Sequence, residues 1–200
     1  MRTSLFAAVS CAALLTAAAA PAAALPAPTP APVVVSAVSE TISDAELRSF
    51  AAAMDSVQPI AAALNGAAPT AEQQAQMAAA IEASGLALER FNAISTAVST
   101  DAVVRARLNL ATTEPSPAGS AAAAVTDAEV EQFVVAMAAV QPIAAALNGA
   151  APTAAQQEEM ATAIEASGLA RERFNAISGA VSQDAHLRAR MAVADARRAG

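Results

Sequence analysis

The chain has 200 residues and a net charge of −7, and its hydrophobic fraction of 56% contains only five Phe and no Trp or Tyr. Much of that fraction is alanine, the strongest helix former and a residue with little surface to bury. This composition predicts an all-α protein whose helices pack through small side chains. The acidic charge and the lack of stacking aromatics disfavour nucleic-acid binding and a polybasic membrane anchor.

Residues 1–24 have the pattern of a secretory signal peptide. Arg2 lies in a short basic start, residues 5–20 form an apolar run, and residues 22–24 are small residues at which a signal peptidase cuts. Pro21 and Pro26 disfavour the alternative, a retained membrane helix. The sequence therefore predicts an exported protein, periplasmic or secreted, with no stable membrane anchor after cleavage.

Cys11 is the only cysteine and lies inside this leader. A lipoprotein would be cut just before Cys11, which would leave most of the apolar run beyond the cut, so we disfavour it. The exported chain then has no cysteine, which excludes disulfides and thiol chemistry. Residues 25–42 carry prolines at 26, 28, 30 and 32 and are predicted to form a Pro/Ala-rich tether. Leader and tether are both expected to be disordered.

A block of sequence occurs twice at an offset of 83 residues. Residues 57–70, VQPIAAALNGAAPT, return letter for letter as residues 140–153. This predicts two tandem copies of a small bundle of three to four helices each, over residues 43–110 and 126–195. A flexible linker is predicted over residues 111–125 and a tail over residues 196–200. Each copy is small enough that one core is marginal, so docking of the two copies, domain swapping or a homodimer all stay open.

The first helix of each copy begins at a capping box, which occupies residues 43–46 and 126–129. Pro59 lies within the first of these helices and is predicted to kink it or to end it. Asn65 and Gly66 are predicted to close the helix in the left-handed conformation.

Three further helices are expected in each copy. In the first copy they begin at the capping box of residues 70–73, near residue 86, and after Asp101. Spacings of three and four give each helix one apolar face. The predicted core positions are Leu47, Phe50, Met54, Val57, Met77, Ala80, Ile81, Ala87, Phe91, Ile94, Val98, Val104 and Leu108, with Leu169, Phe174, Ile177, Val181, Leu187 and Met191 in the second copy.

Part of this pattern resembles a bacterial family. The residues are GLALERFNAI at 85–94 with Asp101 and Arg105, and GLARERFNAI at 168–177 with Asp184 and Arg188. They resemble the secreted helical domain catalogued as domain of unknown function 4168. The resemblance covers both copies and implies an all-helical exported domain with no known chemistry. Such domains usually occur singly, so the two tandem copies are a departure from the family.

No catalytic or metal-binding constellation is predicted. Glu82 and Glu89 flank a turn, as do Glu165 and Glu172, but glutamates on helix surfaces are usually solvated, so we disfavour acid–base catalysis. His186 has no second ligand at helical spacing, so neither a metal nor a cofactor is expected.

Six polar residues are the candidate partner or ligand contacts. The asparagines have poor helix propensity, so they bond either a neighbouring turn or a ligand in a groove. The arginines are expected to pair with acidic residues elsewhere in the same copy. The glutamines precede a helix proline and either shield the carbonyl that it frees or contact a partner. These candidates are Gln58, Arg90, Asn92, Gln141, Arg173 and Asn175.

These observations predict a non-enzymatic protein-interaction module of the cell envelope, which binds an unidentified protein or itself. The alternative is small-molecule or lipid binding between helices, in a pocket lined by Met54, Met77, Met137 and Met160. The same methionines have a simpler role as fillers of core gaps. An enzyme is disfavoured because no nucleophile–base pair can be assembled.

Overall fold

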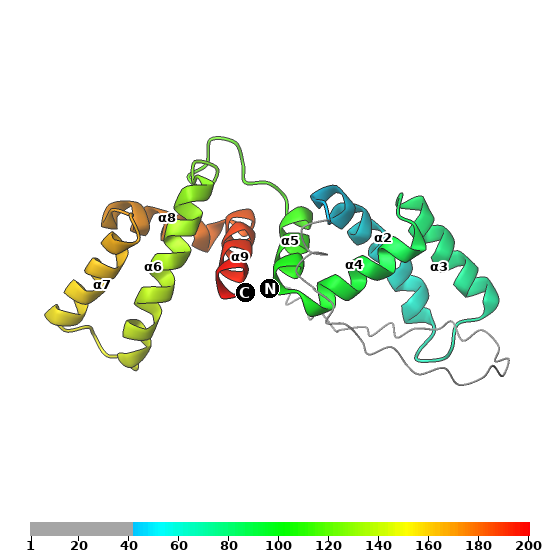
Figure 1. Cartoon of the computed structure of the whole chain (residues 1–200), viewed down its shortest axis with the longest axis horizontal. Helices are drawn as coiled ribbons and strands as arrows, with labels where there is room; N and C mark the ends of the chain where they lie inside the picture. Colours follow the sequence, from blue (N-terminus) through cyan, green and yellow to red (C-terminus); the bar gives the residue numbers. More distant parts are fainter. Residues whose placement is uncertain (1–41) are drawn as a thin grey trace, which may run out of the picture. The chain divides into compact units, whose positions relative to one another are not determined.

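A computed structural model of the whole chain describes residues 42–200 and is all-helical over that range (Figure 1). The predicted all-α class is confirmed for these residues, which contain no strand. The predicted signal peptide, Cys11 and the tether up to residue 41 lie outside the described residues. The helices are α2 (Asp44–Ala63), α3 (Ala71–Ala83), α4 (Leu88–Thr100), α5 (Ala102–Thr112), α6 (Asp127–Ala146), α7 (Ala154–Ala166), α8 (Arg171–Gln183) and α9 (Ala185–Ala199).

The helices between residues 42 and 200 form two sets of four. In the first set, α2–α5, and in the second, α6–α9, a 20-residue helix is followed by two helices of 13 residues. The fourth helices differ, because α5 has 11 residues and α9 has 15. None of these helices is both long and apolar enough to span a bilayer.

The predicted capping boxes are present at the starts of α2, α3, α6 and α7. At α2, the backbone N–H of Glu46 donates to the Ser43 hydroxyl over 3.2 Å, and the backbone N–H of Ser43 donates to the Glu46 carboxylate over 2.8 Å. Each box therefore satisfies two backbone donors that a helix start leaves open. Asp101 caps α5 as predicted, since its carboxylate accepts from the N–H of Val103 over 2.7 Å.

The proline in α2 does not divide the helix. Of the two outcomes predicted for Pro59, an ended helix is wrong, because α2 continues to Ala63. Proline removes one N–H donor and frees the carbonyl four residues earlier, and that carbonyl belongs to Asp55, an exposed residue that water can reach. The left-handed close is confirmed, with φ of 47° at Asn65 and 84° at Gly66.

The two sets have separate hydrophobic cores. The rings of Phe50 and Phe91 lie 4.9 Å apart in the core of the first set, and those of Phe133 and Phe174 lie 4.8 Å apart in the core of the second. Phe91 and Phe174 therefore belong to different cores. Among the described residues no polar or charged residue is classed as buried, so apolar contacts alone fill both interiors.

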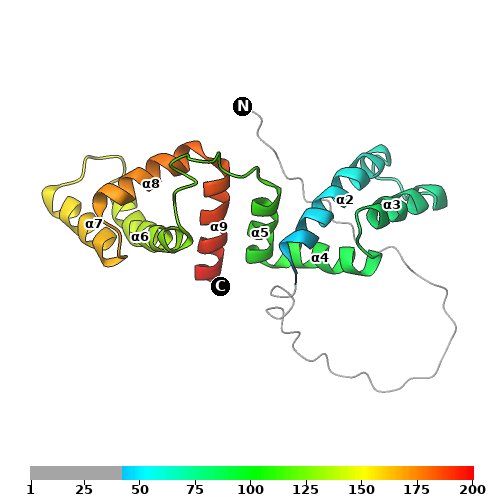
Figure 2. The same cartoon turned by 90° about the horizontal axis from the view of Figure 1, so that it is seen from above.

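Part of the predicted linker packs with the second set. Ala122 and Val125 are 4% and 3% exposed and belong to the core of α6–α9. The hydroxyl of Ser116 donates to the carboxylate of Asp184 over 2.9 Å. α5 also packs against α9, and the two helices lie side by side in both views (Figures 1 and 2).

Candidate functional site

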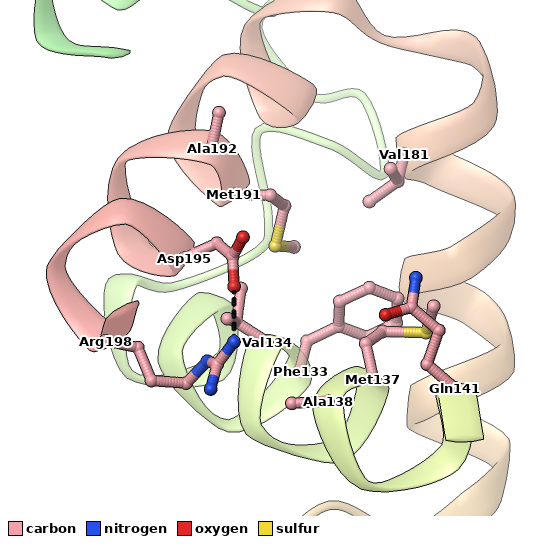
Figure 3. Close-up of a pocket in the computed structure, with 10 residues that line it drawn as sticks. All are labelled: Phe133, Val134, Met137, Ala138, Gln141, Val181, Met191, Ala192, Asp195 and Arg198. Carbon is pink, nitrogen blue, oxygen red and sulfur yellow. Dashed lines mark hydrogen bonds and ion pairs between the residues drawn. The ribbon is translucent and has the colours of Figure 1, made fainter. Parts of the chain in front are cut away.

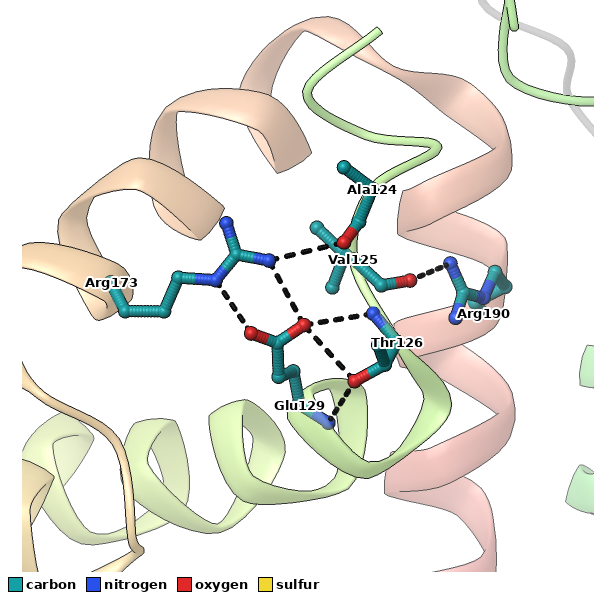
Figure 4. Close-up of polar contacts among 6 residues, drawn as sticks. All are labelled: Ala124, Val125, Thr126, Glu129, Arg173 and Arg190. Atoms are coloured by element: carbon teal, nitrogen blue, oxygen red, sulfur yellow. Dashed lines mark hydrogen bonds and ion pairs between the residues drawn. The ribbon is translucent and has the colours of Figure 1, made fainter. Parts of the chain in front are cut away.

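A carboxylate–guanidinium clasp ties α8 to the start of α6 (Figure 4). Arg173 donates from Nε to Glu129 Oε1 over 2.6 Å and from Nη2 to Glu129 Oε2 over 2.9 Å. Its Nη2 also donates to the carbonyl of Ala124 over 3.2 Å. Glu129 is at the same time the capping-box partner of Thr126. One carboxylate thus secures both the helix start and the contact between two helices.

The first set has the equivalent clasp. Arg90 Nε donates to Glu46 Oε1 over 2.7 Å. The predicted pairing of Arg90 and Arg173 with acidic residues is thereby confirmed, and each pair lies within one set of helices. Beside each clasp, a second ion pair links the fourth helix of the set to the first. Arg107 Nη2 on α5 lies 2.6 Å from Asp44 Oδ1 on α2, and Arg190 Nη2 on α9 lies 2.6 Å from Asp127 Oδ1 on α6.

The clasps lower the pKa of both glutamates. Hydrogen bonds from Arg90 and then from Ser43 hold the pKa of Glu46 at about 2, and those from Arg173 and Thr126 hold the pKa of Glu129 at about 2. A carboxylate with a lowered pKa is a poor proton carrier near neutral pH. The clasps therefore keep both glutamates charged near neutral pH, and the ion pairs hold the helices together.

We expect the chain to lose stability in acid through these clasps. A carboxyl whose folded pKa is about 2 stabilises the fold fully above its unfolded pKa of 4.5, and this contribution disappears as the pH falls from about 4.5 through 2. The glutamate side chains are 29% and 23% exposed, so solvent screening limits each contribution to about 1 kcal/mol.

Urea unfolding followed by circular dichroism at several pH values measures this effect. The double variant Glu46→Gln, Glu129→Gln is expected to be less stable at neutral pH and to show a flatter dependence below pH 4.5. An unchanged slope in the double variant would assign the acid sensitivity to other carboxylates.

The six predicted contact residues do not come together in one place. Arg90 and Arg173 are engaged in the clasps, and the predicted asparagines are exposed on α4 and α8. Gln58 and Gln141 are exposed on α2 and α6. Of the six residues, Gln141 alone lines the apolar groove described next.

The second set contains an apolar groove between α6, α8 and α9 (Figure 3). Its volume is about 310 Å³. At one end Arg198 Nη2 lies 2.9 Å from Asp195 Oδ1, and Met137, which is 37% exposed, is open to solvent. The groove is lined by Phe133, Val134, Met137, Ala138, Gln141, Val181, Met191, Ala192, Asp195 and Arg198.

The charged end of this groove depends on the length of α9. α5 ends at Thr112, the counterpart of Asp195, and the counterpart of Arg198 is Pro115, which lies beyond that helix. The ion pair that borders the groove thus has no equivalent in the first set. The groove was not predicted from the sequence, because it depends on how α9 packs beside α6 and α8. The available signal was the run of helix-forming residues from Met191 to Ala199.

The acidic residues considered for catalysis lie apart on the surface. Glu82, Glu89, Glu165 and Glu172 are exposed, and Glu165 pairs with Arg171 over 3.3 Å with both side chains more than half exposed. His186 is half-buried on α9. Within residues 42–200 no three His, Cys, Asp or Glu side chains are grouped so that they could hold a metal ion.

Comparison of the chain with protein families, with curated proteins and with solved structures found no match. The resemblance to domain of unknown function 4168 stays a prediction from its short motifs.

Proposed function

We propose that the chain is an exported, non-enzymatic protein-interaction module of the cell envelope, built from two tandem copies of one helical domain. The duplicated sequence and the matching helices support the two copies. The signal-peptide pattern at residues 1–24 supports export, and the motifs at residues 85–105 and 168–188 support membership of the family that they resemble.

The observation that carries the binding role is the apolar groove of the second set. The exposed Met137 and the half-buried Val181 present apolar surface in an open cleft, above the buried Phe133 and Met191, which is the form of site that takes the apolar face of a partner's helix. Methionines suit such a surface because their flexible side chains adapt to a partner. The Glu46–Arg90 and Glu129–Arg173 pairs tie helices of the fold together, so we assign the binding role to the groove and not to these polar side chains.

Site-specific photo-crosslinking in the exporting cell tests this role. A benzoylphenylalanine at position 141 replaces an exposed residue that lines the groove, and one at position 58 is the matched control in the same local sequence. We expect protein adducts from position 141 that disappear when Met137→Glu is added, and none from position 58. Equal adducts from both positions, or none from either, would contradict a role for the groove.

Small-molecule or lipid binding is the second candidate, because Met137 and Met191 both line the groove. Its volume of about 310 Å³ lies at the lower end of roughly 300–1,000 Å³ for ligand pockets. Of the four methionines predicted to line a pocket, Met54 and Met77 pack against the first core, and Met160 is half-buried on α7. Native mass spectrometry of the purified chain would show a bound adduct that Met137→Glu removes.

A further inference from the structure

Helix α9 has two buried faces. Leu187 and Met191 point into the core of the second set, whereas Ala189 and Val193 are 1% and 5% exposed without belonging to that core. Two residues along an α-helix is a rotation of about 200°, so Ala189 and Val193 lie on nearly the opposite side from Leu187 and Met191. Because α9 packs against α5, α5 is the element that buries this second face.

Helix α5 carries an equivalent second face. Val104 and Leu108 pack in the first core, and Ala106 and Leu110 stand two residues further along, both half-buried. At the offset of 83 residues, Ala106 corresponds to Ala189, and Leu110 corresponds to Val193. The two helices therefore join through one and the same surface, which we call the α5–α9 joint.

A surface that binds its own equivalent is the requirement for a two-fold interface between copies of a protein. We propose that the α5–α9 joint also joins two copies of this chain, with α5 of each copy packed against α9 of the other. The joint uses a different face of α9 from the groove, so this proposal stands independently of the proposed function.

The connection between the two sets allows this exchange. Ser116 bonds Asp184 of the second set and Ala122 is buried with it, so residues 113–115 are the part of the connection that can act as a hinge. The closed monomer and the exchanged dimer contain the same joint. The equilibrium between them therefore depends on how readily α9 folds back onto α5 of its own chain. A short flexible connection gives an effective concentration on the order of 1 mM, and the closed monomer is therefore favoured at micromolar concentration.

Shortening the hinge tests the proposal on the exported chain, residues 25–200. Deletion of residues 113–115 removes the slack that lets α9 fold back onto α5. Sedimentation at about 10 µM, far below the effective concentration, is expected to show a monomer for the intact chain and a dimer for the deletion variant. Ala106→Glu, which places a charge in the joint, is expected to return the dimer to monomer, whereas Asn109→Glu on the exposed side of α5 leaves it dimeric.

A deletion variant that stays a helical monomer would overturn the proposal, as would a dimer that survives Ala106→Glu. If circular dichroism shows that the deletion variant is unfolded, the intact chain is unfolded in urea and refolded at about 1 mM, near the effective concentration. If the intact chain then forms a dimer and the Ala106→Glu variant does not, the result supports exchange through the joint. If the intact chain refolds only to monomer, the proposal is overturned.

Discussion

Replacing Phe174 by alanine is expected to unfold α6–α9 while α2–α5 stay folded. Phe174 is 9% exposed and its ring stacks on Phe133 at 4.8 Å. A buried Phe→Ala change costs about 3–5 kcal/mol. A core in a set of this size supplies only about 3–5 kcal/mol of net stability, so the loss removes most or all of it. The first set keeps its own core around Phe50 and Phe91.

Hydrogen exchange read out by mass spectrometry separates the two sets peptide by peptide. Phe174→Ala is expected to abolish protection in α6–α9, and the matched variant Phe91→Ala is expected to abolish it in α2–α5. Loss of protection in both sets for either variant would mean that the two cores unfold as one cooperative unit.

A glutamate in place of Ala189 is expected to separate the two sets. Ala189 is 1% exposed at the α5–α9 joint, and an unpaired charge buried there costs several kcal/mol. The joint can open and expose the carboxylate to water, so the actual cost is limited to the docking energy of α5 on α9. Both cores are expected to remain intact, because Leu187 and Met191 face the other side of α9.

Small-angle scattering and hydrogen exchange together measure this separation. Ala189→Glu is expected to increase the radius of gyration and to leave core amides protected. Ala192→Glu, at an exposed position of the same helix, is expected to change neither. An unchanged radius for Ala189→Glu would show that the joint tolerates a charge.

Local structure was predictable from the sequence because its determinants are local. The boxes at Ser43 and Thr126 and the turn at Asn65–Gly66 depend on residues within four positions of one another. Pro59 was harder to predict, because a helix continues past a proline wherever the freed carbonyl can reach water. The sequence predicted that Arg90 would pair with an acid but did not identify Glu46, which lies 44 residues earlier.

The groove and the joint were not predicted, for a tertiary reason. Both depend on where α9 lies, and helical periodicity finds one buried face on a helix, not two. The second face of α9 buries only one alanine and one valine, Ala189 and Val193, which gives a weak apolar signal. The sequence carries another signal at the offset of 83 residues, because Leu110 corresponds to Val193 and an apolar residue recurs there away from the core face.

The methionine methyl groups provide the most direct test that the groove is the binding surface. Met54, Met77, Met137, Met160 and Met191 are the methionines that follow the predicted leader, and Met137 and Met191 line the groove while Met54 and Met77 pack against the first core. Methyl NMR spectra of the labelled chain are recorded with the protein fraction of an envelope extract and with its small-molecule fraction. We predict that the protein fraction shifts or broadens Met137 and Met191 and leaves Met54 and Met77 unchanged. Spectra that stay unchanged with the protein fraction, or that change at Met54 and Met77 to the same extent, would contradict the account.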